Sequence, residues 1–436
     1  MKEYQLKRNQ ELLLRDGRKI TVVDKLGIGG QGVVYKVRLE SGEMRALKWY
    51  FETKLSDAEG FYRHLAQNID AGSPSPTFIW PEELTEWHHG TFGYIMPLYP
   101  KGYEGFAKFI TARVNFRSID AMINAALNIV TAFMDLHNKG YNYQDLNDGN
   151  FSIHPQNGDV LICDNDNVGG HGFESGILGK SRYMAPEVVR REKKPDKLTD
   201  RFSLAVVLFI LLFGDHPLEG KRTNVPALTG KYEKRFFGEK PLFIFDPKDD
   251  SNRPVEGLHR NAIAKWPYFP SYLQEAFIQS FSQESLLNGN DRLLETMWRH
   301  VLMRLKASLV KCPHCHEPVF AESREFICPA CNEKIKPAGY IKFPKRANMD
   351  ILVPIMGGAR LFAYHMDESS EARENIAAHI MEKPGKFGLK NESQSKWTIS
   401  APDDSQVIKN PGDVAVIGDG FKLDFGHGIT GEVTKI

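Results

Sequence analysis

Apolar and polar residues alternate near the start of the chain in the pattern of a sheet. Residues 20–50 predict three strands, with a glycine-rich turn between the first two. The stretch 80–91 is polar and loop-like, and the apolar run that begins at Gly93 predicts one more strand. Helical segments are expected over 56–69 and over 119–137, where apolar residues recur at helical spacing.

The longest apolar run is Leu204–Phe213, and its ten residues are too few for a membrane-spanning helix, which needs about 20. A buried helix is the better interpretation. Short strand-like runs separated by Gly, Pro and Asp turns follow over 347–436, with the clearest alternation at Phe421, Leu423 and Phe425. They predict a small β-sandwich-like domain. Because no catalytic cluster is visible in it, a binding or assembly role is favoured over a second enzyme.

The totals narrow the class of protein. At 436 residues the chain is long enough for roughly two to four domains. Lys+Arg of 56 against Asp+Glu of 55 leaves a net charge of +1, which argues against nucleic acid or acidic membranes as partners. The first residues lack the apolar core of a secretory signal, so we expect a cytoplasmic protein.

Four of the five cysteines form two C-x-x-C pairs separated by twelve residues: Cys312, Cys315, Cys328 and Cys331. Four thiolates at this spacing can close a tetrahedron around Zn²⁺ and leave no open position, so a structural metal is predicted. We assign residues 308–340 to a zinc ribbon, with redox-active dithiols as the alternative. The fifth cysteine, Cys163, is expected to pack in a core, with a reactive thiol as its alternative.

A group of polar residues suited to phosphoryl transfer lies near the middle of the chain. Asp145 precedes Asn150 by five residues, and Asp164 follows the apolar strand Val160–Cys163. One carboxylate can orient an attacking hydroxyl, while an amide and a second carboxylate can hold magnesium on the phosphates. This spacing also arises by chance, so its weight depends on the motifs around it.

A glycine-rich turn precedes these residues. Gly27, Gly29 and Gly32 form G-x-G-x-x-G, whose backbone amides can approach phosphate oxygens without side-chain obstruction. A glycine hairpin without a ligand is the alternative. The motif leads into the run V-V-Y-K-V rather than a helix, which argues against a dinucleotide fold. Lys48 then follows in an apolar strand, an order that resembles the nucleotide loop and lysine of protein kinases.

Two later motifs complete the series. Tyr183–Glu187 reads Y-M-A-P-E, and T-D-R-F-S-L begins at Thr199. Six motifs in this order make residues 20–305 resemble a eukaryotic-type serine/threonine protein kinase. The resemblance implies a bilobal α+β protein-kinase fold at 1–307, followed by the zinc ribbon and the β-rich domain. Its N-lobe would end near residue 97.

The resemblance also implies a site for ATP and magnesium (or manganese). Lys48 would bind the phosphates, Asp145 would be the catalytic base, and Asn150 and Asp164 would hold the metal. Asp200 would support the catalytic loop. The remaining residues expected at the nucleotide lie in the glycine turn or near the hinge: Gly27, Gly29, Gly30, Gly32, Val34, Met96 and Leu98.

Lys48 needs a carboxylate to fix its position, and the helical segment 56–69 is where we expect it. Glu59 is the best candidate in that segment, and Glu52 is its competitor. The alternative for Glu59 is a solvated charge on the face of the helix. We therefore predict an ion pair between Lys48 and Glu59.

The catalytic loop departs from the kinase pattern. Tyr143 and Gln144 replace His and Arg before the base, so switching by an activation-loop phosphate is not expected. Asn147 replaces the usual lysine, and the loop D-L-N-D-G-N resembles that of small-molecule phosphotransferases. We predict that Lys180 supplies the missing positive charge beside the transferred phosphoryl group. An exposed loop lysine is the alternative.

The motif D-F-G of kinases reads D-N-D here. Asp164 keeps the metal-binding position, but Asp166 replaces the flexible glycine. Asp166 is a possible second metal ligand, although a surface or helix-capping role is favoured. The glycines between Gly169 and Gly179 predict a mobile segment.

The order of kinase, zinc ribbon and β-rich domain resembles bacterial kinases of tellurite-resistance-type (TerY-type) phosphorylation triads. That resemblance implies a bacterial signalling or stress system, with a von Willebrand factor A protein and a metal-dependent protein phosphatase as partners. An active serine/threonine kinase that acts on protein hydroxyls is favoured, because Lys48, Asp145, Asn150 and Asp164 are all present. A pseudokinase scaffold and a small-molecule phosphotransferase are the alternatives.

Overall fold

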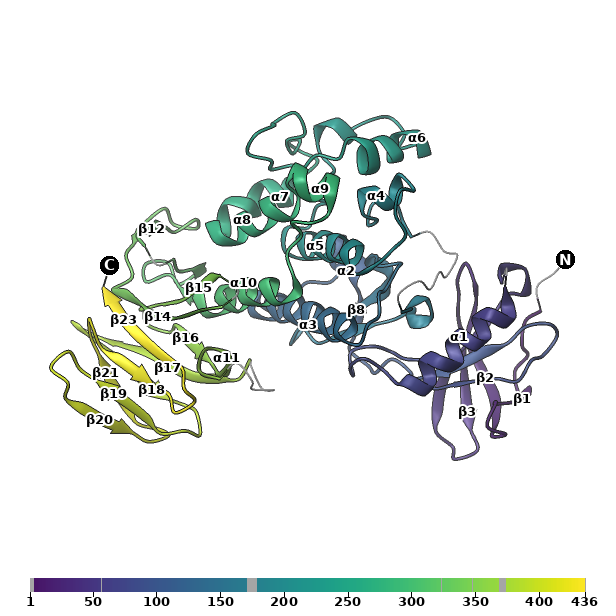
Figure 1. The fold of residues 1–436 in the computed structure, drawn as a ribbon, viewed down its shortest axis with the longest axis horizontal. Coiled ribbons are helices and arrows are strands. Elements are labelled where there is room, and N and C mark those ends of the chain that lie inside the picture. Colours follow the sequence, from purple (N-terminus) through teal and green to yellow (C-terminus); the bar gives the residue numbers. More distant parts are fainter. Residues whose placement is uncertain are drawn as a thin grey trace. The chain divides into compact units, whose positions relative to one another are not determined.

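The computed structural model describes residues 4–55, 57–170, 179–322, 324–346, 348–367 and 374–435 (Figure 1). The chain forms two compact units, each assembled from separate segments. The first contains Met1–Arg117, Thr131–Val207 and Gly230–Lys240, and the second contains Ser118–Val130, Leu208–Thr229 and Pro241–Ile436. The predicted boundaries near 307 and 347 do not coincide with this division, and the three-domain arrangement stays a prediction.

Six strands of the first unit form an antiparallel sheet in the order β1-β2-β3-β4-β6-β5. Their bounds are β1 Glu11–Leu13, β2 Lys19–Ile28, β3 Gly32–Leu39, β4 Met44–Tyr50, β5 Glu83–Leu84 and β6 Gly93–Met96. The three strands predicted over 20–50 and the strand at Gly93 are confirmed. The stretch 80–91, predicted as a loop, contributes the edge strand β5, because Leu84 is apolar and fully buried.

Helix α1 (Ala58–Ala71) belongs to the same unit as this sheet and confirms the predicted helical segment. The side chain of Asp57 caps its first turn by accepting a bond from the Gly60 amide, and Gly72 ends it with a positive φ of 74°. Leu65 turns inward and joins a buried cluster with aromatic and aliphatic side chains of β4 and β6.

The remaining part of the first unit carries the hairpin that positions the polar motifs. Strands β7 (Glu104–Gly105), β8 (Phe151–Ile153) and β9 (Val160–Ile162) form a small sheet. The 3₁₀ turn η2 (Asp148–Asn150) directly precedes β8, and η3 (Asn165–Asn167) follows β9. Because β8 and β9 are antiparallel, these two turns lie at the same end of the hairpin. Short helical elements complete this unit: α2 Phe106–Ile110, α4 Pro186–Val189, α6 Gly230–Glu233 and the π-helical η5 Lys234–Glu239.

Two long apolar helices confirm the predictions made for them. Helix α3 spans Ile119–Asn138, and α5 spans Lys197–Phe213. Every residue of the apolar run Leu204–Phe213 is buried. By length and composition α3 passes the test for a membrane span, but 56% of that apolar window is buried inside the protein, as in a core helix.

The second unit continues with helices packed around aromatic rings. They are α7 Arg260–Lys265, α8 Ser271–Ser280, α9 Gln283–Asn288 and α10 Glu295–Ser308. Phe213 packs edge-on against Phe277 with ring centroids 5.5 Å apart, and Trp266 stacks on Phe245 at 4.2 Å. These contacts form the core of the helical part of the unit.

Two short hairpins follow α10. The first pairs β10 (Leu309–Lys311) with β11 (Pro318–Phe320), and the second pairs β12 (Phe326–Ile327) with β13 (Lys334–Ile335). Each hairpin holds one C-x-x-C pair in its turn.

The C-terminal part is rich in strands, as predicted. One sheet has the order β15-β14-β23-β22-β19-β20 and the other β16-β17-β18-β21. Their bounds are β14 Gly339–Arg346, β15 Met349–Pro354, β16 Arg360–Phe362, β17 Ile376–Lys383, β18 Lys386–Asn391, β19 Trp397–Ser400, β20 Gln406–Lys409, β21 Val414–Ile417, β22 Lys422–Asp424 and β23 Thr430–Lys435. The first strand starts at Gly339, ahead of the predicted residue 347. Within the region 347–436, predicted to hold only short strands, β16 ends at Phe362 and the chain continues as a short helix, α11 (Ala363–Met366).

Candidate active site

The turn between β2 and β3 keeps its backbone open on one side. The Gly29 amide donates to the Gly32 carbonyl at 2.9 Å. A Cβ atom on Gly27 or Gly30 would meet no heavy atom within 4 Å, whereas one on Gly32 would lie 2.1 Å from the Trp49 carbonyl oxygen. Gly32 is therefore required by the packing of the sheet, while the turn at Gly27 and Gly30 leaves room for a ligand.

Lys48 lies on β4, and its side chain is buried in the first unit with 8% exposed. Its Nζ donates to Asp166 Oδ2 at 2.6 Å and also reaches Gln31 Oε1 at 3.3 Å and Asp164 Oδ1 at 3.4 Å. Burial alone would lower the pKa of Lys48, but attraction to Asp166 and then to Asp164 outweighs it and raises that pKa. Lys48 is therefore a charged donor that links β4 to the segment after β9.

Asp166 is not the surface or helix-capping residue that the sequence favoured. Its side chain is fully buried, and Oδ2 accepts bonds from Lys48 Nζ at 2.6 Å and Tyr50 OH at 2.5 Å. The other oxygen, Oδ1, has no hydrogen-bond partner among the described residues. A buried carboxylate is costly unless it is paired, so the two donors on β4 account for its stability in this position.

The structure gives Lys48 a different partner from the predicted Glu59. Glu59 lies in the first turn of α1 and is exposed, and Glu52 is exposed in a separate 3₁₀ turn. The inner face of α1 carries His64 and Asn68, and both side chains bond to the Val168 carbonyl oxygen, at 2.8 and 2.9 Å. The helix is thus attached to the backbone beyond Asp166 and brings no carboxylate to Lys48.

Two asparagine side chains hold the loop around Asp145. Asn147 Nδ2 donates to Asp145 Oδ1 at 3.1 Å, while its own Oδ1 accepts from the Gly149 amide at 2.9 Å. Asn150 Nδ2 donates to the Asp145 carbonyl and to Tyr143 OH, each at 3.1 Å. Asn147, which replaces the usual lysine, therefore orients the carboxylate of Asp145.

The environment of Asp145 shifts its acidity. Burial raises the pKa of this carboxyl group to about 6; the bond from Asn147 opposes the shift, and the charge of Asp164 adds to it. A carboxyl group with a pKa near 6 is ionised at neutral pH and can still accept a proton, as a general base must.

The prediction that Asp200 supports this loop is confirmed. Its Oδ2 accepts from the Tyr143 amide at 2.7 Å and contacts His137 Nε2 at 3.1 Å. The hydroxyl of Tyr143 donates to the carbonyl oxygen of Cys163. Tyr143, which replaces the usual histidine, therefore ties the loop to the end of β9.

The D-N-D turn is pinned to the surrounding backbone. Asp164 has a left-handed backbone (φ 56°), and its side chain is 54% exposed. The next side chain, Asn165, is fully buried and donates from Nδ2 to the carbonyls of Ile79 at 2.8 Å and Ile162 at 2.9 Å. Cys163 is partly buried, and burial raises the pKa of its thiol to about 12, which argues against the reactive-thiol alternative. Its packing in a core stays a prediction.

Lys180 lies at the catalytic loop. Its Nζ donates to Asp148 Oδ1 at 2.9 Å, and 56% of its side chain is exposed. Its charge also acts to lower the pKa of Asp145. The predicted role in phosphoryl transfer stays a prediction, as does the alternative of an exposed loop lysine. Of the glycines in the predicted mobile segment, Gly172 and Gly176 lie outside the described residues.

Predicted nucleotide contacts gather on one apolar wall. Met96 is buried in a cluster with Ala46, Tyr94 and Leu161, and partly buried side chains packed against it include Val34 and Leu98. The three predicted residues thus come from β3, β6 and the connection after β6.

Sequence reasoning missed Gln31, Tyr50 and Asp166 around Lys48. The sequence did not single out Asp166, and the structure shows why α1 supplies no partner: it contains only two acidic residues, Glu59 and Asp70. Glu59 lies in its first turn and is exposed. Asp70 is 68% exposed and pairs with Arg15, which follows β1. A helix without an inward carboxylate indicates that the partner of Lys48 comes from elsewhere.

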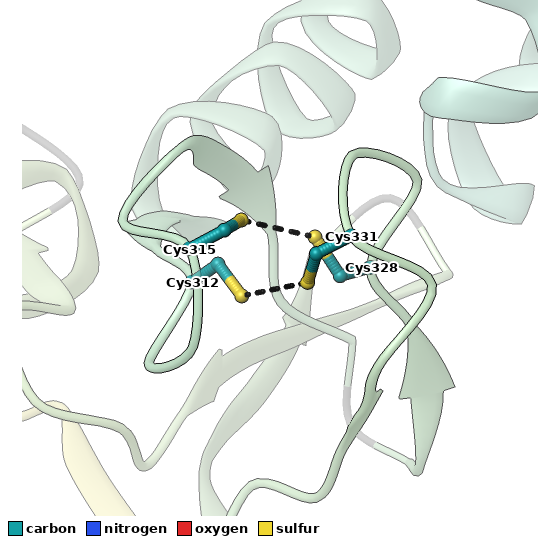
Figure 2. Close-up of side chains that lie close together, drawn as sticks. All are labelled: Cys312, Cys315, Cys328 and Cys331. Atoms are coloured by element: carbon teal, nitrogen blue, oxygen red, sulfur yellow. Dashed lines mark hydrogen bonds between the residues drawn. The ribbon is translucent and has the colours of Figure 1, made fainter.

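The four paired cysteines form one cluster. Their Sγ atoms all lie within 4.8 Å of one another, and Figure 2 shows the two hairpin turns facing each other. The separation is 3.8 Å both for Cys312–Cys331 and for Cys315–Cys328. A Zn–S bond of about 2.3 Å corresponds to sulfurs about 3.8 Å apart at the corners of a tetrahedron. The donor set therefore fits a four-coordinate divalent metal.

The two turns that carry these cysteines repeat one backbone geometry. The Cys312 amide donates to the Glu317 carbonyl at 2.9 Å, and the Cys328 amide donates to Glu333 at 2.8 Å. His316 and Asn332, the fourth residues after each first cysteine, have φ values of 63° and 66°. Equivalent turns present equivalent thiols, as a symmetric metal site requires.

Comparison with known proteins gives the family. The family described as "Protein kinase domain" matches residues 20–240, which is half of the chain. The chain therefore belongs to the protein kinase domain family. The match covers the glycine turn, Lys48, the loop around Asp145 and the D-N-D turn.

Individual relatives agree with this assignment. Protein kinase YegI of Escherichia coli strain K12 is 24% identical over 327 residues, covering 70% of this chain and 48% of that protein. Calcium-dependent protein kinase 5 of Plasmodium falciparum is 28% identical over 249 residues, 54% of this chain and 41% of the relative. Serine/threonine-protein kinase AfsK of Streptomyces griseus is 23% identical over 237 residues, with 48% and 26% covered. The chain spans less than half the length of each of these relatives.

Proposed function

We propose that the chain is a protein kinase that uses ATP and magnesium (or manganese) to phosphorylate serine or threonine hydroxyls of proteins. One observation carries the proposal: Lys48 lies 3.4 Å from Asp164, while Asn150 bonds to the backbone of Asp145. These four residues, predicted from three motifs, form two pairs within one compact unit, and the charge of Asp164 acts on Asp145. Phosphoryl transfer from a magnesium nucleotide requires these side chains in one site.

Each residue has a role in this proposal. Asp145, with its raised pKa, accepts the proton of the attacking hydroxyl. Asn150 and Asp164 hold the metal, which offsets negative charge on the phosphates when it is bound. Lys48 positions the phosphates beneath the open glycine turn, and the apolar wall of Val34, Met96 and Leu98 contacts the base.

Lys180 supplies the positive charge that the missing loop lysine would otherwise provide. Its support is its place at the catalytic loop, where it pairs with Asp148 at 2.9 Å and its charge acts on Asp145. A cation at this position stabilises charge that develops during transfer.

The cysteine cluster holds a structural zinc ion in a zinc ribbon. Support comes from the four Sγ atoms within 4.8 Å and from the matched turns that carry them. Four protein thiolates leave no position for water, so the metal would stabilise the hairpins rather than catalyse a reaction.

The kinase acts in the cytoplasm of a bacterium, in a signalling or stress system. Two of the relatives, YegI and AfsK, are bacterial kinases, which supports this setting. The strand-rich C-terminal part serves as a regulatory or assembly module. Its partners include a von Willebrand factor A protein and a metal-dependent protein phosphatase, as the order of the modules suggests.

The experiment is transfer of labelled γ-phosphate from Mg·ATP to the purified chain and to a mixture of acceptor proteins, followed by mapping of the modified residues by mass spectrometry. Asp145→Ala is the test variant. Asp159→Ala is its matched control, because Asp159 is an exposed carboxylate on the β8–β9 hairpin. Phosphoserine or phosphothreonine formed by the wild type and the control, but not by Asp145→Ala, is the expected result.

Two results would contradict the proposal. Nucleotide binding with no transfer to any acceptor would favour a scaffold, and transfer to small hydroxyl compounds alone would favour a small-molecule phosphotransferase. Because the loop D-L-N-D-G-N resembles that of small-molecule phosphotransferases, small hydroxyl compounds are included among the acceptors.

A further inference from the structure

The carboxylate beside Lys48 comes from the segment after β9. Asp166 lies in η3, its side chain is fully buried, and its Oδ2 stands 2.6 Å from Lys48 Nζ. The Asp164 oxygen is farther away, at 3.4 Å, and belongs to a side chain that is 54% exposed. The closer and more deeply buried charge dominates, because low-dielectric surroundings strengthen its attraction. Asp166 is therefore the main anion at Lys48.

Helix α1 offers no substitute for Asp166. Its acidic residues are Glu59, which is exposed in the first turn, and Asp70, which is 68% exposed and bonded to Arg15 at 3.2 Å. The side chains that α1 directs toward the D-N-D segment are His64 and Asn68, and they bond to a backbone carbonyl. In protein kinases a glutamate of the corresponding helix forms an ion pair with this lysine. Helix α1 forms no such pair with Lys48.

A second donor fixes the position of the Asp166 carboxylate. Tyr50 OH donates to the same Oδ2 at 2.5 Å. Tyr50 and Lys48 stand two residues apart on β4, so they lie on the same face of the strand. Burial and then the Asp166 charge hold the pKa of Tyr50 well above its usual range, so the phenol stays protonated. The carboxylate is thereby held against two consecutive inward positions of one strand.

We propose that Asp166 is the positioning residue for Lys48, setting where the ammonium group stands in the nucleotide site through its shared bonds to Lys48 and Tyr50. This rests on the proposed function, which supplies the role of Lys48. Because the partner follows Asp164 by two residues, the lysine and the metal-binding position are fixed by one turn. The carboxylate that pairs with Lys48 therefore comes from the turn after β9 and not from α1.

The test measures kcat and KM for Mg·ATP together with the affinity for a fluorescent ATP analogue. Asp166→Asn keeps the shape of the side chain and removes its charge. We expect kcat/KM for ATP to fall about 100-fold, the size of effect that follows when a catalytic group is misplaced by about 1 Å. Lys48→Ala should cause a loss of at least this size. Glu59→Gln, the matched carboxylate-to-amide change on α1, should leave both constants within about twofold, as surface changes do.

A double mutant separates positioning from a general structural role. If Asp166 acts through Lys48, then Asp166→Asn should add less than about threefold to the loss of nucleotide affinity in Lys48→Ala, since effects of coupled residues are not additive. A merely structural Asp166 would lower affinity to the same extent in both backgrounds. Tyr50→Phe removes only one donor to Oδ2, so it should raise KM for ATP in a folded protein even where Asp166→Asn proves unstable.

The outcomes distinguish this inference from the proposed function. If the wild type transfers phosphate and Asp166→Asn matches it while Glu59→Gln loses activity, the inference fails and the function stands. If the wild type binds nucleotide without transferring phosphate, the function fails, and the affinity arm still decides the role of Asp166. A wild type that binds no nucleotide overturns both.

Discussion

At the scale of single residues, Asp145 provides a pH probe of the proposed chemistry. Burial raises its pKa from 3.8 to about 6, so in the folded protein the carboxyl group is protonated below about pH 6. Activity that needs the carboxylate should therefore be present above pH 6 and fall as the pH drops through that value. The measurement is kcat/KM for the protein acceptor against pH, and a flat profile between pH 5 and 7 would exclude Asp145 as the base.

Asn147 tunes that profile in a predictable direction. Its side chain donates to Asp145 Oδ1 at 3.1 Å, and this bond acts to lower the pKa of Asp145. Asn147→Ala should therefore shift the acidic limb of the profile to higher pH. Thr111→Ala, an exposed hydroxyl that bonds only within α2 and its cap, should leave the limb in place. A limb that moves to lower pH in Asn147→Ala would contradict the orienting role of the amide.

Lys180 is tested by its removal. Lys180→Ala should lower kcat about 100-fold with nucleotide affinity unchanged, because a group that acts on developing charge contributes to the transition state and not to binding. The matched control is Lys108→Ala, which breaks an exposed ion pair with Glu104 of similar exposure. Near-normal turnover in Lys180→Ala would leave the residue as a loop lysine that pairs with Asp148.

Residue roles divide into those that local pattern can predict and those that it cannot. Asp145, Asn150 and Asp164 follow from spacing, because a short loop and one strand set their separation. The partner of Lys48 does not follow from spacing, because the sequence offers several carboxylates as candidates. The choice of Asp166 over Glu59 depends on the left-handed turn at Asp164 and on the buried anchor at Asn165.

At the scale of elements, the glycines of the turn between β2 and β3 have two different roles, one in packing of the sheet and one in leaving room for a ligand. Gly32→Ala should destabilise the fold by about 1–3 kcal/mol, because its Cβ would lie 2.1 Å from the Trp49 carbonyl and the strand cannot yield freely. Gly30→Ala meets no atom within 4 Å and should change stability by less than about 0.5 kcal/mol. It should nevertheless raise KM for ATP. Thermal unfolding and ATP kinetics on the two variants measure this contrast, and equal KM values for Gly30→Ala and wild type would contradict a phosphate-covering role.

The cysteine hairpins make a second prediction at this scale. The purified chain should contain one zinc ion, and Cys315→Ser or Cys331→Ser should lose it, because both thiols belong to the cluster within 4.8 Å. Cys163→Ser, outside the cluster, should keep the metal. Chelation should speed hydrogen exchange over 309–335 while amides of the first unit are unaffected, since metal binding is coupled to local folding. A metal-free chain with protected hairpin amides would contradict a structural zinc.

Element type was predictable wherever apolar periodicity was long. The helices at 119–137 and Leu204–Phe213 and the strands over 20–50 are present as expected. Short elements were less predictable because tertiary burial decides them. The strand at Glu83–Leu84 lies in a stretch that looked polar, and Tyr364 and His365 leave the strand pattern for a buried helical turn.

At the scale of the whole molecule, the strand-rich part is joined to helices of its own compact unit by a partly buried polar network. Arg360 of β16 donates to both Asp120 oxygens, at 2.8 and 3.0 Å, near the start of α3. The same guanidinium donates to the Lys306 carbonyl on α10 at 3.1 Å, and Lys306 Nζ reaches Glu374 at 2.9 Å. The C-terminal strands should therefore unfold together with these helices.

A double-mutant cycle on this network tests the coupling. Arg360→Ala and Asp120→Ala should be non-additive by about 1 kcal/mol, as a bidentate, partly exposed pair allows. Burial would raise the pKa of Asp120, but the Arg360 bond outweighs it and lowers the pKa. The stabilisation is thus present above the ordinary pKa of 3.8 and is lost as the pH falls through the lowered value. Urea unfolding of the four proteins at pH 7 measures the coupling, and strict additivity would show that the pair stabilises nothing.

The most direct measurement of the central claim is the initial rate of γ-phosphate transfer to a protein hydroxyl by wild type, Asp145→Asn and Asp159→Asn, with nucleotide affinity measured on the same preparations. Loss of a general base lowers turnover by about 10²- to 10⁴-fold and leaves ground-state binding of ATP intact. We predict that Asp145→Asn shows this loss with unchanged nucleotide affinity, while Asp159→Asn equals wild type. Equal transfer rates in all three proteins would contradict the assignment of this site as a kinase active centre.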